Sequence, residues 1–168
     1  MFDDLLAANR RYQAGFDDSG LRGKAAKGLA VVTCIDSRID PLAMLGLRPG
    51  DAKIIRNAGA RVTEDALRSL ILAANLLDVT RVCVVQHTEC AMAGQREDDL
   101  RARIGELRGT DASGTDFLTM TDQVAALQGD IERIRACPLL PPDLEVGGFM
   151  FDVRSGAITP AAPHQPSS

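Results

Sequence analysis

Four short runs of apolar and β-branched residues, separated by segments with helical periodicity, most constrain how this chain folds. The runs are residues 29–34, 52–57, 81–86 and 146–153. The helical segments between them are residues 63–77, 97–107 and 119–135. Strands that alternate with helices predict an α/β fold with a mainly parallel four-stranded sheet flanked by helices. Residues 157–159 follow a turn, and we expect them to form an antiparallel edge strand.

The length and composition predict one domain. The chain has 168 residues, of which 45% are hydrophobic and 25% charged, as is ordinary for a globular protein with a real core. We expect this domain to cover residues 1–159. An amphipathic helix is predicted at residues 2–16, and residues 160–168, rich in Pro and Ser, are expected to be a disordered tail.

The charge and hydropathy patterns exclude some classes of partner. The formal net charge of -4 argues against nucleic acid or an anionic membrane as the main partner. No apolar run approaches the roughly 20 residues that a transmembrane helix needs, and the acidic N-terminus is unlike a signal peptide. We therefore expect a cytoplasmic protein whose four cysteines are thiols or metal ligands and not disulfides.

Residues suited to bind a metal follow two of the predicted strands. Cys34 ends the first run, and His87 and Cys90 come directly after the third. Parallel strands place their carboxyl ends on one rim of a sheet, so these side chains are expected to meet. Taken singly, each is explained as a core residue, but the set favours zinc, which binds Cys and His and keeps a fourth position open in catalytic sites. The long separation between Cys34 and His87 excludes a zinc finger.

A carboxylate and a guanidinium lie beside the first ligand. Asp36 and Arg38 follow Cys34 by two and four residues. A carboxylate next to zinc can orient a bound hydroxide, or bind the metal as fourth ligand, and an arginine fork can hold it off the metal. The alternative is an incidental ion pair on a loop. With two thiolates and one imidazole, the zinc complex is neutral and still lowers the pKa of a bound water to about 7.

The other cysteines and the second histidine have simpler explanations. Cys83 lies within the third run, where a small buried apolar residue is expected. Cys137 precedes a proline near a helix end and is expected in a loop. His164 falls in the predicted tail and is expected to be solvated.

The combined motifs resemble the β-class carbonic anhydrases, most closely the short bacterial members. They are Cys-x-Asp-Ser-Arg from Cys34, then Arg56-Asn57-Ala58-Gly59, then His-x-x-Cys from His87. The resemblance covers residues 29–90, with weaker support from the strand at 148–153.

This resemblance implies roles for six residues. Cys34, His87 and Cys90 would bind one zinc ion per subunit, Asp36 and Arg38 would form the catalytic dyad, and Gly59 would belong to the backbone wall of the substrate site. The implied activity is that of a zinc lyase. Zinc-bound hydroxide hydrates carbon dioxide reversibly to bicarbonate and a proton, and the dyad controls the fourth coordination position.

The resemblance also implies a homodimer or homotetramer, in which the helix at residues 2–16 packs on a neighbouring subunit. A helix packed on its own domain is the alternative. Three departures from the family pattern stand out. Ala91 replaces the glycine that usually follows the second cysteine, the chain lacks the tryptophan of a noncatalytic bicarbonate site, and no histidine near the motif is free to shuttle protons.

Three other functions remain open from the sequence. The same zinc site would serve a carbonyl sulfide or carbon disulfide hydrolase. A non-catalytic site would keep Asp36 as a permanent fourth ligand. A redox role for Cys34 and Cys90 is disfavoured, because a redox pair would not require His87.

Overall fold

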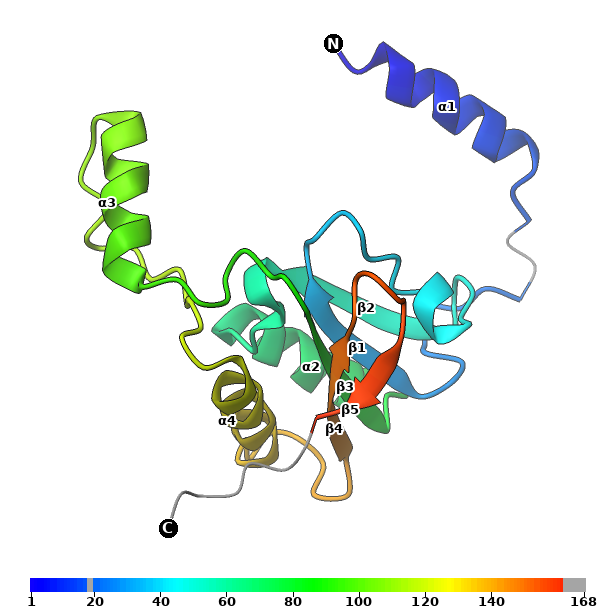
Figure 1. Cartoon of the computed structure of the whole chain (residues 1–168). Coiled ribbons are helices and arrows are strands. Elements are labelled where there is room, and N and C mark those ends of the chain that lie inside the picture. The colour runs from blue at the N-terminus through cyan, green and yellow to red at the C-terminus, as the bar shows by residue number, and fades with distance from the viewer. Residues whose placement is uncertain (18–19, 162–168) are drawn as a thin grey trace.

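A five-stranded sheet forms the centre of the molecule (Figure 1). The computed structural model describes residues 1–17 and 20–161. The strands are β1 (Leu29–Cys34), β2 (Ala52–Asn57), β3 (Arg81–His87), β4 (Glu145–Phe151) and β5 (Ile158–Pro160). They lie in the order β2-β1-β3-β4-β5, with β1 to β4 parallel and β5 antiparallel to β4. The predicted α/β class and the antiparallel edge strand are confirmed.

The edge strand extends past its expected end. Pro160 is the last residue of β5, and the N–H of Ala161 donates to the carbonyl of Gly148 at 2.9 Å. The prediction of a disordered tail from residue 160 was therefore wrong for Pro160 and Ala161, whose backbones pair with β4. The rest of that predicted tail, residues 162–168 with His164, lies outside the described residues.

Within residues 1–17 and 20–161, four α-helices and two short 3-10 turns connect and flank the strands. The helices are α1 (Asp3–Ala14), α2 (Glu64–Leu76), α3 (Glu97–Arg108) and α4 (Gln123–Arg135), and the turns are η1 (Ala43–Leu45) and η2 (Ala58–Ala60). The Thr63 hydroxyl accepts from the N–H of Ala66, so Thr63 is the N-cap of α2. Asp122 caps α4 in the same way, through the N–H of Ala125. The fourth helix therefore begins at residue 123, four residues later than the sequence pattern predicts.

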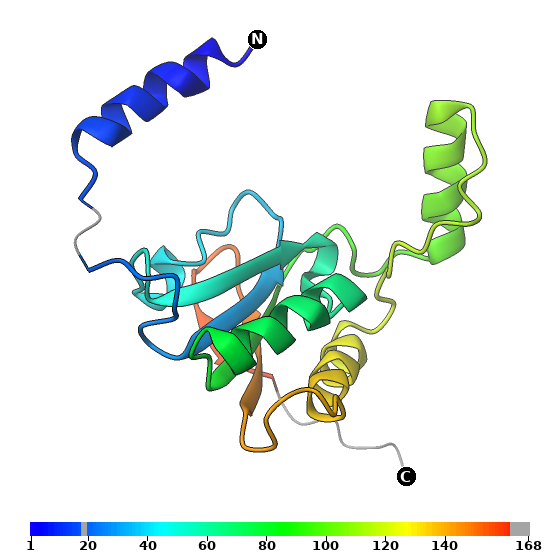
Figure 2. The same cartoon turned by 180° about the vertical axis from the view of Figure 1, so that it is seen from behind.

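Helices α2 and α4 cover the same face of the sheet (Figure 2). Leu70 of α2 and Leu127 of α4 are fully buried there against Val32 and Val84 of the central strands. The opposite face is covered by η1 and by loops, with Met120 buried against the strands. Strands β1 and β3 are thus apolar on both faces, which explains their nearly continuous apolar sequence.

Two helices stand away from this body (Figures 1 and 2). No residue of α1 or α3 is buried. Along and beside α1, large apolar side chains are exposed: Phe2, Leu5, Leu6, Tyr12 and Phe16. The helix predicted at residues 2–16 is therefore present, but it buries none of its residues against its own domain.

None of the helices in the described ranges combines the length and the apolar character needed to cross a membrane.

Candidate metal centre

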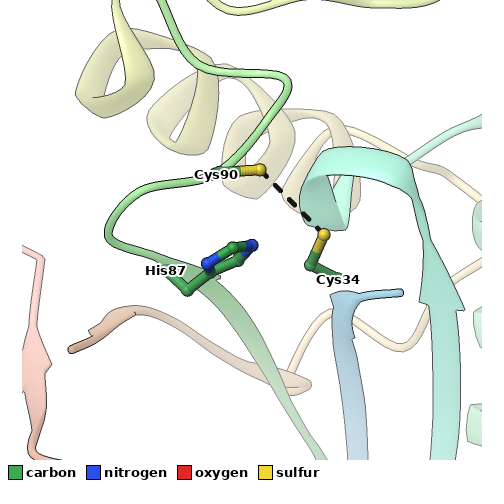
Figure 3. A group of neighbouring side chains, drawn as sticks. All are labelled: Cys34, His87 and Cys90. Carbon is green, nitrogen blue, oxygen red and sulfur yellow. Dashed lines mark hydrogen bonds between the residues drawn. The ribbon is translucent and has the colours of Figure 1, made fainter. Parts of the chain in front are cut away.

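The three predicted metal ligands meet at the point in the sheet where the strand order reverses. From β1 the chain passes to β2 on one side and later to β3 on the other, so the carboxyl ends of β1 and β3 border a topological switch point. Cys34 is the last residue of β1 and His87 the last of β3. Cys90 follows on the next turn, and the three side chains converge on one space (Figure 3).

The distances in this group fit a tetrahedral metal. The two sulfur atoms lie 4.0 Å apart, and all three ligand atoms lie within 4.8 Å of one another. Zinc–sulfur bonds of about 2.3 Å in a tetrahedron place two sulfurs about 3.8 Å apart. Cys34, His87 and Cys90 are 4%, 1% and 6% exposed, so all three side chains are buried.

His87 is oriented to present one nitrogen to this space. Its Nδ1 lies 2.8 Å from the carbonyl of Thr88, which accepts the ring proton and so leaves Nε2 with a free lone pair. Nε2 is buried and has no hydrogen-bond partner in the described part of the chain. A buried ring nitrogen without a partner is costly unless a ligand binds it. The residues present therefore fit a metal ion.

The two thiols influence each other strongly. The Cys90 thiol donates to the Cys34 sulfur and, against the effect of burial, lowers the pKa of Cys34 to about 3. The N–H of Gly59 also donates to that sulfur, at 3.4 Å. The same thiol–thiolate contact, together with burial, raises the pKa of Cys90 well above its usual value. Without a metal, the pair thus carries one proton at neutral pH, and a cation that binds both sulfurs displaces it.

Asp36 and Arg38 form a bidentate ion pair at the edge of the ligand group. Arg38 donates from Nε to Oδ1 at 2.9 Å and from Nη2 to Oδ2 at 2.8 Å, and its backbone N–H donates to Oδ1 at 2.9 Å. These bonds hold the pKa of Asp36 well below its usual range. Oδ2 lies 3.8 Å from Nε2 of His87, so the carboxylate stands next to the ligand atoms.

Two residues of the second predicted motif support the loop after β1. Arg56 donates to the carbonyls of Cys34 and Asp36, at 2.9 and 2.8 Å, and so fixes the backbone between them. Gly59 has a φ of 79°, and a Cβ there would lie 3.2 Å from Cε of Met120. Its backbone amide is directed at the Cys34 sulfur, so Gly59 lies beside the ligand group.

Residues that the sequence did not single out also contact the site. Gln123 donates to the carbonyl of His87 at 2.9 Å. Glu89 accepts from Nη1 of Arg38 at 3.2 Å, and Arg154 in turn binds Glu89. Glu89 lies inside the His-x-x-Cys motif, so its charge was a usable signal. Gln123 and Arg154 offered none, since their contacts depend on tertiary structure.

The loop after Cys90 does not need the glycine that Ala91 replaces. Among the described residues, four that are not glycine have φ in the left-handed region: Ala60, Asp78, Glu89 and Leu118. Ala91 is outside this group. Its backbone conformation therefore accommodates a Cβ without the strain that would favour glycine.

Comparison with known proteins places this geometry in a family. A family model described as carbonic anhydrase matches residues 29–109. The chain is 34% identical over 161 residues to β-carbonic anhydrase 1 of Mycobacterium bovis. This alignment covers 96% of this chain and 98% of that protein. The crystal structure of a carbonic anhydrase from Streptococcus mutans aligns with a TM-score of 0.89 at 34% identity, over 96% of this chain and 97% of that chain.

A carbon disulfide hydrolase of an Acidianus strain is also related, with 31% identity over 151 residues, 76% of this chain and 74% of that protein. Similarity of this extent, in sequence and in fold, shows that the chain belongs to the β-carbonic anhydrases, a family of metalloenzymes.

Proposed function

We propose that this protein is a zinc-dependent carbonic anhydrase that interconverts carbon dioxide and bicarbonate. The observation that carries the proposal is the ion-paired carboxylate of Asp36, held 3.8 Å from the ligand nitrogen of His87. A site that only stabilised the fold would not need a charged acceptor at this point. The 34% identity to a β-carbonic anhydrase over 96% of the chain supports the same activity.

The donor set favours zinc. Two thiolates and one neutral imidazole are ligands that zinc prefers, and Cys34, His87 and Cys90 would hold the ion through Sγ, Nε2 and Sγ. When bound with three protein ligands, zinc supplies a water of pKa about 7 at its fourth position and thereby a nucleophile at neutral pH.

Asp36 and Arg38 would govern that fourth position. Because Arg38 keeps the pKa of Asp36 low, the carboxylate stays ionised and acts as a hydrogen-bond acceptor that does not take up the proton. It can accept a hydrogen bond from the nucleophile and aim its lone pair at the substrate carbon. Arg38 occupies both carboxylate oxygens and so restrains Asp36 from binding the metal itself.

We place Gly59 in the wall of the substrate site. The absence of a side chain leaves space next to the Cys34 sulfur, where a Cβ would meet Met120 and Met92 at 3.2 and 3.4 Å. Carbon dioxide is small, linear and free of a leaving group, so a narrow wall of backbone and apolar atoms suffices to orient it.

A decisive experiment is stopped-flow carbon dioxide hydration by the zinc-loaded protein and its Asp36→Ala variant, with metal content measured in parallel. We expect the parent to be active and the variant to retain zinc while losing about 100-fold in rate, as for the loss of a group that orients the nucleophile. Asp99→Ala, on the projecting helix α3, is the matched control and should behave as the parent. Negligible hydration by the zinc-loaded parent refutes the proposal.

Carbon disulfide hydrolysis is the second candidate, favoured by the 31% identity to the Acidianus enzyme. The site chemistry is the same in kind, because a linear heteroallene is attacked at carbon in both reactions. Rates with carbon dioxide, carbonyl sulfide and carbon disulfide, measured side by side on one zinc-loaded preparation, separate the two. Turnover of the sulfur compounds alone replaces our first candidate with the second.

A closed, non-catalytic site is distinguished by a different result. If Asp36 were a permanent fourth ligand, the zinc-loaded protein would hydrate no carbon dioxide even at alkaline pH. Asp36→Ala would then open the metal to external anions, whereas the parent would bind none.

We also propose that the protein is a homodimer or homotetramer. The apolar side chains exposed along α1 have no core of their own to cover them, and a second copy of the chain would supply one. Sedimentation equilibrium of the parent and of a Leu5→Asp, Leu6→Asp variant tests this. A parent that sediments as a monomer, or a variant that associates as the parent does, contradicts it.

A further inference from the structure

We propose that Glu89, itself held by Arg154, positions Arg38 and thereby sets how firmly Asp36 is kept off the metal. The inference rests on the proposed function, because it concerns the fourth position of the same site. It assigns a role to Glu89 and Arg154, which are not among the three predicted metal ligands.

The guanidinium of Arg38 donates hydrogen bonds on two sides, to Asp36 and to Glu89. One edge of its guanidinium, Nε and Nη2, binds the two oxygens of Asp36. On the other side, Nη1 donates to Oε2 of Glu89 at 3.2 Å and Nη2 donates to the Glu89 carbonyl at 3.3 Å. A guanidinium has five N–H donors in one plane, so Asp36 and Glu89 do not compete for the same proton. Bonds on both sides fix the plane in which Arg38 meets Asp36.

Glu89 is held in turn by the segment that joins β4 to β5. Both Nε and Nη2 of Arg154 contact Oε1 of Glu89, the oxygen that Arg38 leaves free. The turn that carries Arg154 is fixed by Asp152, whose Oδ1 accepts from the backbone N–H groups of Arg154 and Ser155, at 2.9 and 2.7 Å. The result is an alternating row of charges, Asp36, Arg38, Glu89 and Arg154.

The backbone ties the same two segments together. Thr88 donates its N–H to the carbonyl of Phe151 at 2.9 Å, and its hydroxyl accepts from the N–H of Val153 at 3.1 Å. Glu89 adopts a φ of 56°, a conformation that a residue with a side chain rarely takes without support. The loop of the metal ligands and the β4–β5 turn therefore form one unit, and Glu89 is the side chain through which this unit reaches Arg38.

These contacts are partly solvated, which limits their size. The side chains of Arg38 and Glu89 are 43% and 41% exposed, and ion pairs of this exposure change an equilibrium by about two- to fivefold. An effect of that size suits a group that tunes the balance between an Asp36 bound to Arg38 and an Asp36 bound to the metal.

The test uses cobalt-substituted protein with azide as the probe, followed by visible absorption. An external anion enters the fourth position only where Asp36 has left it, so the apparent azide Kd reports the fraction of open sites. We compare the parent with Glu89→Ala, Glu89→Gln, Arg154→Ala and the double variant Glu89→Ala, Arg154→Ala. Glu106→Ala, an exposed glutamate on α3, is the matched control.

We expect the azide Kd to rise in Glu89→Ala by up to about two- to fivefold, because the full factor appears only where the Asp36-bound state dominates. The rise should be smaller in Glu89→Gln, whose amide oxygen still accepts from Arg38. Arg154→Ala should have a smaller effect alone and none in the Glu89→Ala background, because it acts through Glu89. Glu106→Ala should match the parent. Bound cobalt should be equal in all variants, which separates positioning from loss of the metal.

An unchanged azide Kd in Glu89→Ala overturns the inference. If Arg154→Ala changes the azide Kd by the same factor in the parent and in Glu89→Ala, Arg154 does not act through Glu89, and its assigned role is overturned. A parent that binds cobalt but not azide overturns the inference together with the open site that we propose. A parent that binds azide with the expected pattern, but hydrates no carbon dioxide when loaded with zinc, contradicts the proposed function alone.

Discussion

Arg38 binds both carboxylate oxygens of Asp36, with side-chain bonds of 2.9 Å to Oδ1 and 2.8 Å to Oδ2. This pairing lowers the pKa of Asp36 and places its Oδ2 3.8 Å from Nε2 of His87. The two residues come from one short loop after β1, and the carbonyl of Asp36 is fixed independently by Arg56. The orientation of the carboxylate thus depends on Arg38.

Replacing Arg38 should therefore impair activity while sparing the metal. In Arg38→Ala the carboxylate is released and can bind the metal, so we expect carbon dioxide hydration to fall about 10- to 100-fold, the range for losing a charge-assisted hydrogen bond. Arg38→Lys should recover little of this, since an ammonium group cannot make the two parallel bonds. Stopped-flow rates with zinc content measured on the same samples check the expectation. A lysine variant with parental activity would show that charge alone suffices.

Metal uptake should release protons, and its affinity should rise with pH. The pKa of Cys34 is lowered to about 3 and that of Cys90 is raised, so at pH 7 the metal-free pair carries one proton, on Cys90. A metal that binds both thiolates displaces this proton, so each unit of pH should strengthen zinc binding by at least about tenfold near neutrality. Against the effect of burial, the Cys34 sulfur raises the pKa of His87, so the metal also competes with a proton on that ring. Calorimetry in buffers of different ionisation enthalpy measures the release.

Cys83→Ala is the control for that measurement. Cys83 lies outside the ligand group, and burial raises the pKa of its thiol, so its removal should leave proton release unchanged. Zinc binding at pH 7 without any proton release would contradict the protonation state that we assign to Cys90.

The convergence of Cys34, His87 and Cys90 was predictable because strand ends are visible in the sequence. Cys34 and His87 close β-branched runs, and the parallel topology brings the ends of adjacent strands together. The cap at Thr63 was predictable for a similar reason, since its hydroxyl satisfies a backbone group three residues away. Both signals are local, and each fixes where an element begins or ends.

Other features depend on contacts that no local pattern carries. The fourth helix was expected from residue 119, but the Thr119 hydroxyl binds Glu97 and the N–H of Met120 binds the carbonyl of Met92. These partners hold the backbone outside a helix and delay its start to residue 123. The row from Asp36 to Arg154 was hidden for the same reason, because Glu89 and Arg154 are 65 residues apart.

The segment that returns from α3 should loosen in acid. Glu97 accepts from the N–H of Thr119, from the N–H of Phe117 and from the Thr119 hydroxyl, and these bonds lower its pKa. A carboxyl with a lowered pKa in the folded state contributes stability above its unfolded pKa of about 4.3 and loses it as pH falls through the folded value.

Hydrogen exchange of the Phe117 and Thr119 amides, corrected for intrinsic rates, should therefore accelerate at and below about pH 4 relative to pH 7. Glu97→Gln should exchange faster than the parent already at pH 7 and show less dependence on pH. Glu106→Gln, on the same helix, should follow the parent. Protection that does not change between pH 7 and pH 3 in the parent would remove Glu97 from this role.

Two glycines on facing elements should respond in opposite directions to alanine. Gly148 of β4 allows α4 to approach the sheet, since a Cβ there would lie 2.5 Å from Cδ1 of Ile131 and 3.3 Å from Cγ of Leu127. Gly148→Ala should lower the free energy of unfolding by about 1–3 kcal/mol through overpacking. Gly129 lies on the exposed side of α4, where a Cβ would meet no atom within 4 Å.

Gly129→Ala should accordingly raise the free energy of unfolding by about 1 kcal/mol, because alanine favours the helix over glycine. Urea unfolding of the metal-loaded protein, with equal metal in every sample, measures both changes on one scale. The two variants make the same change of residue type, but the new methyl group of Gly148→Ala points into the α4–β4 interface and that of Gly129→Ala points into open space. A Gly148→Ala variant as stable as the parent would mean that the packing of α4 on β4 is not as close as these distances indicate.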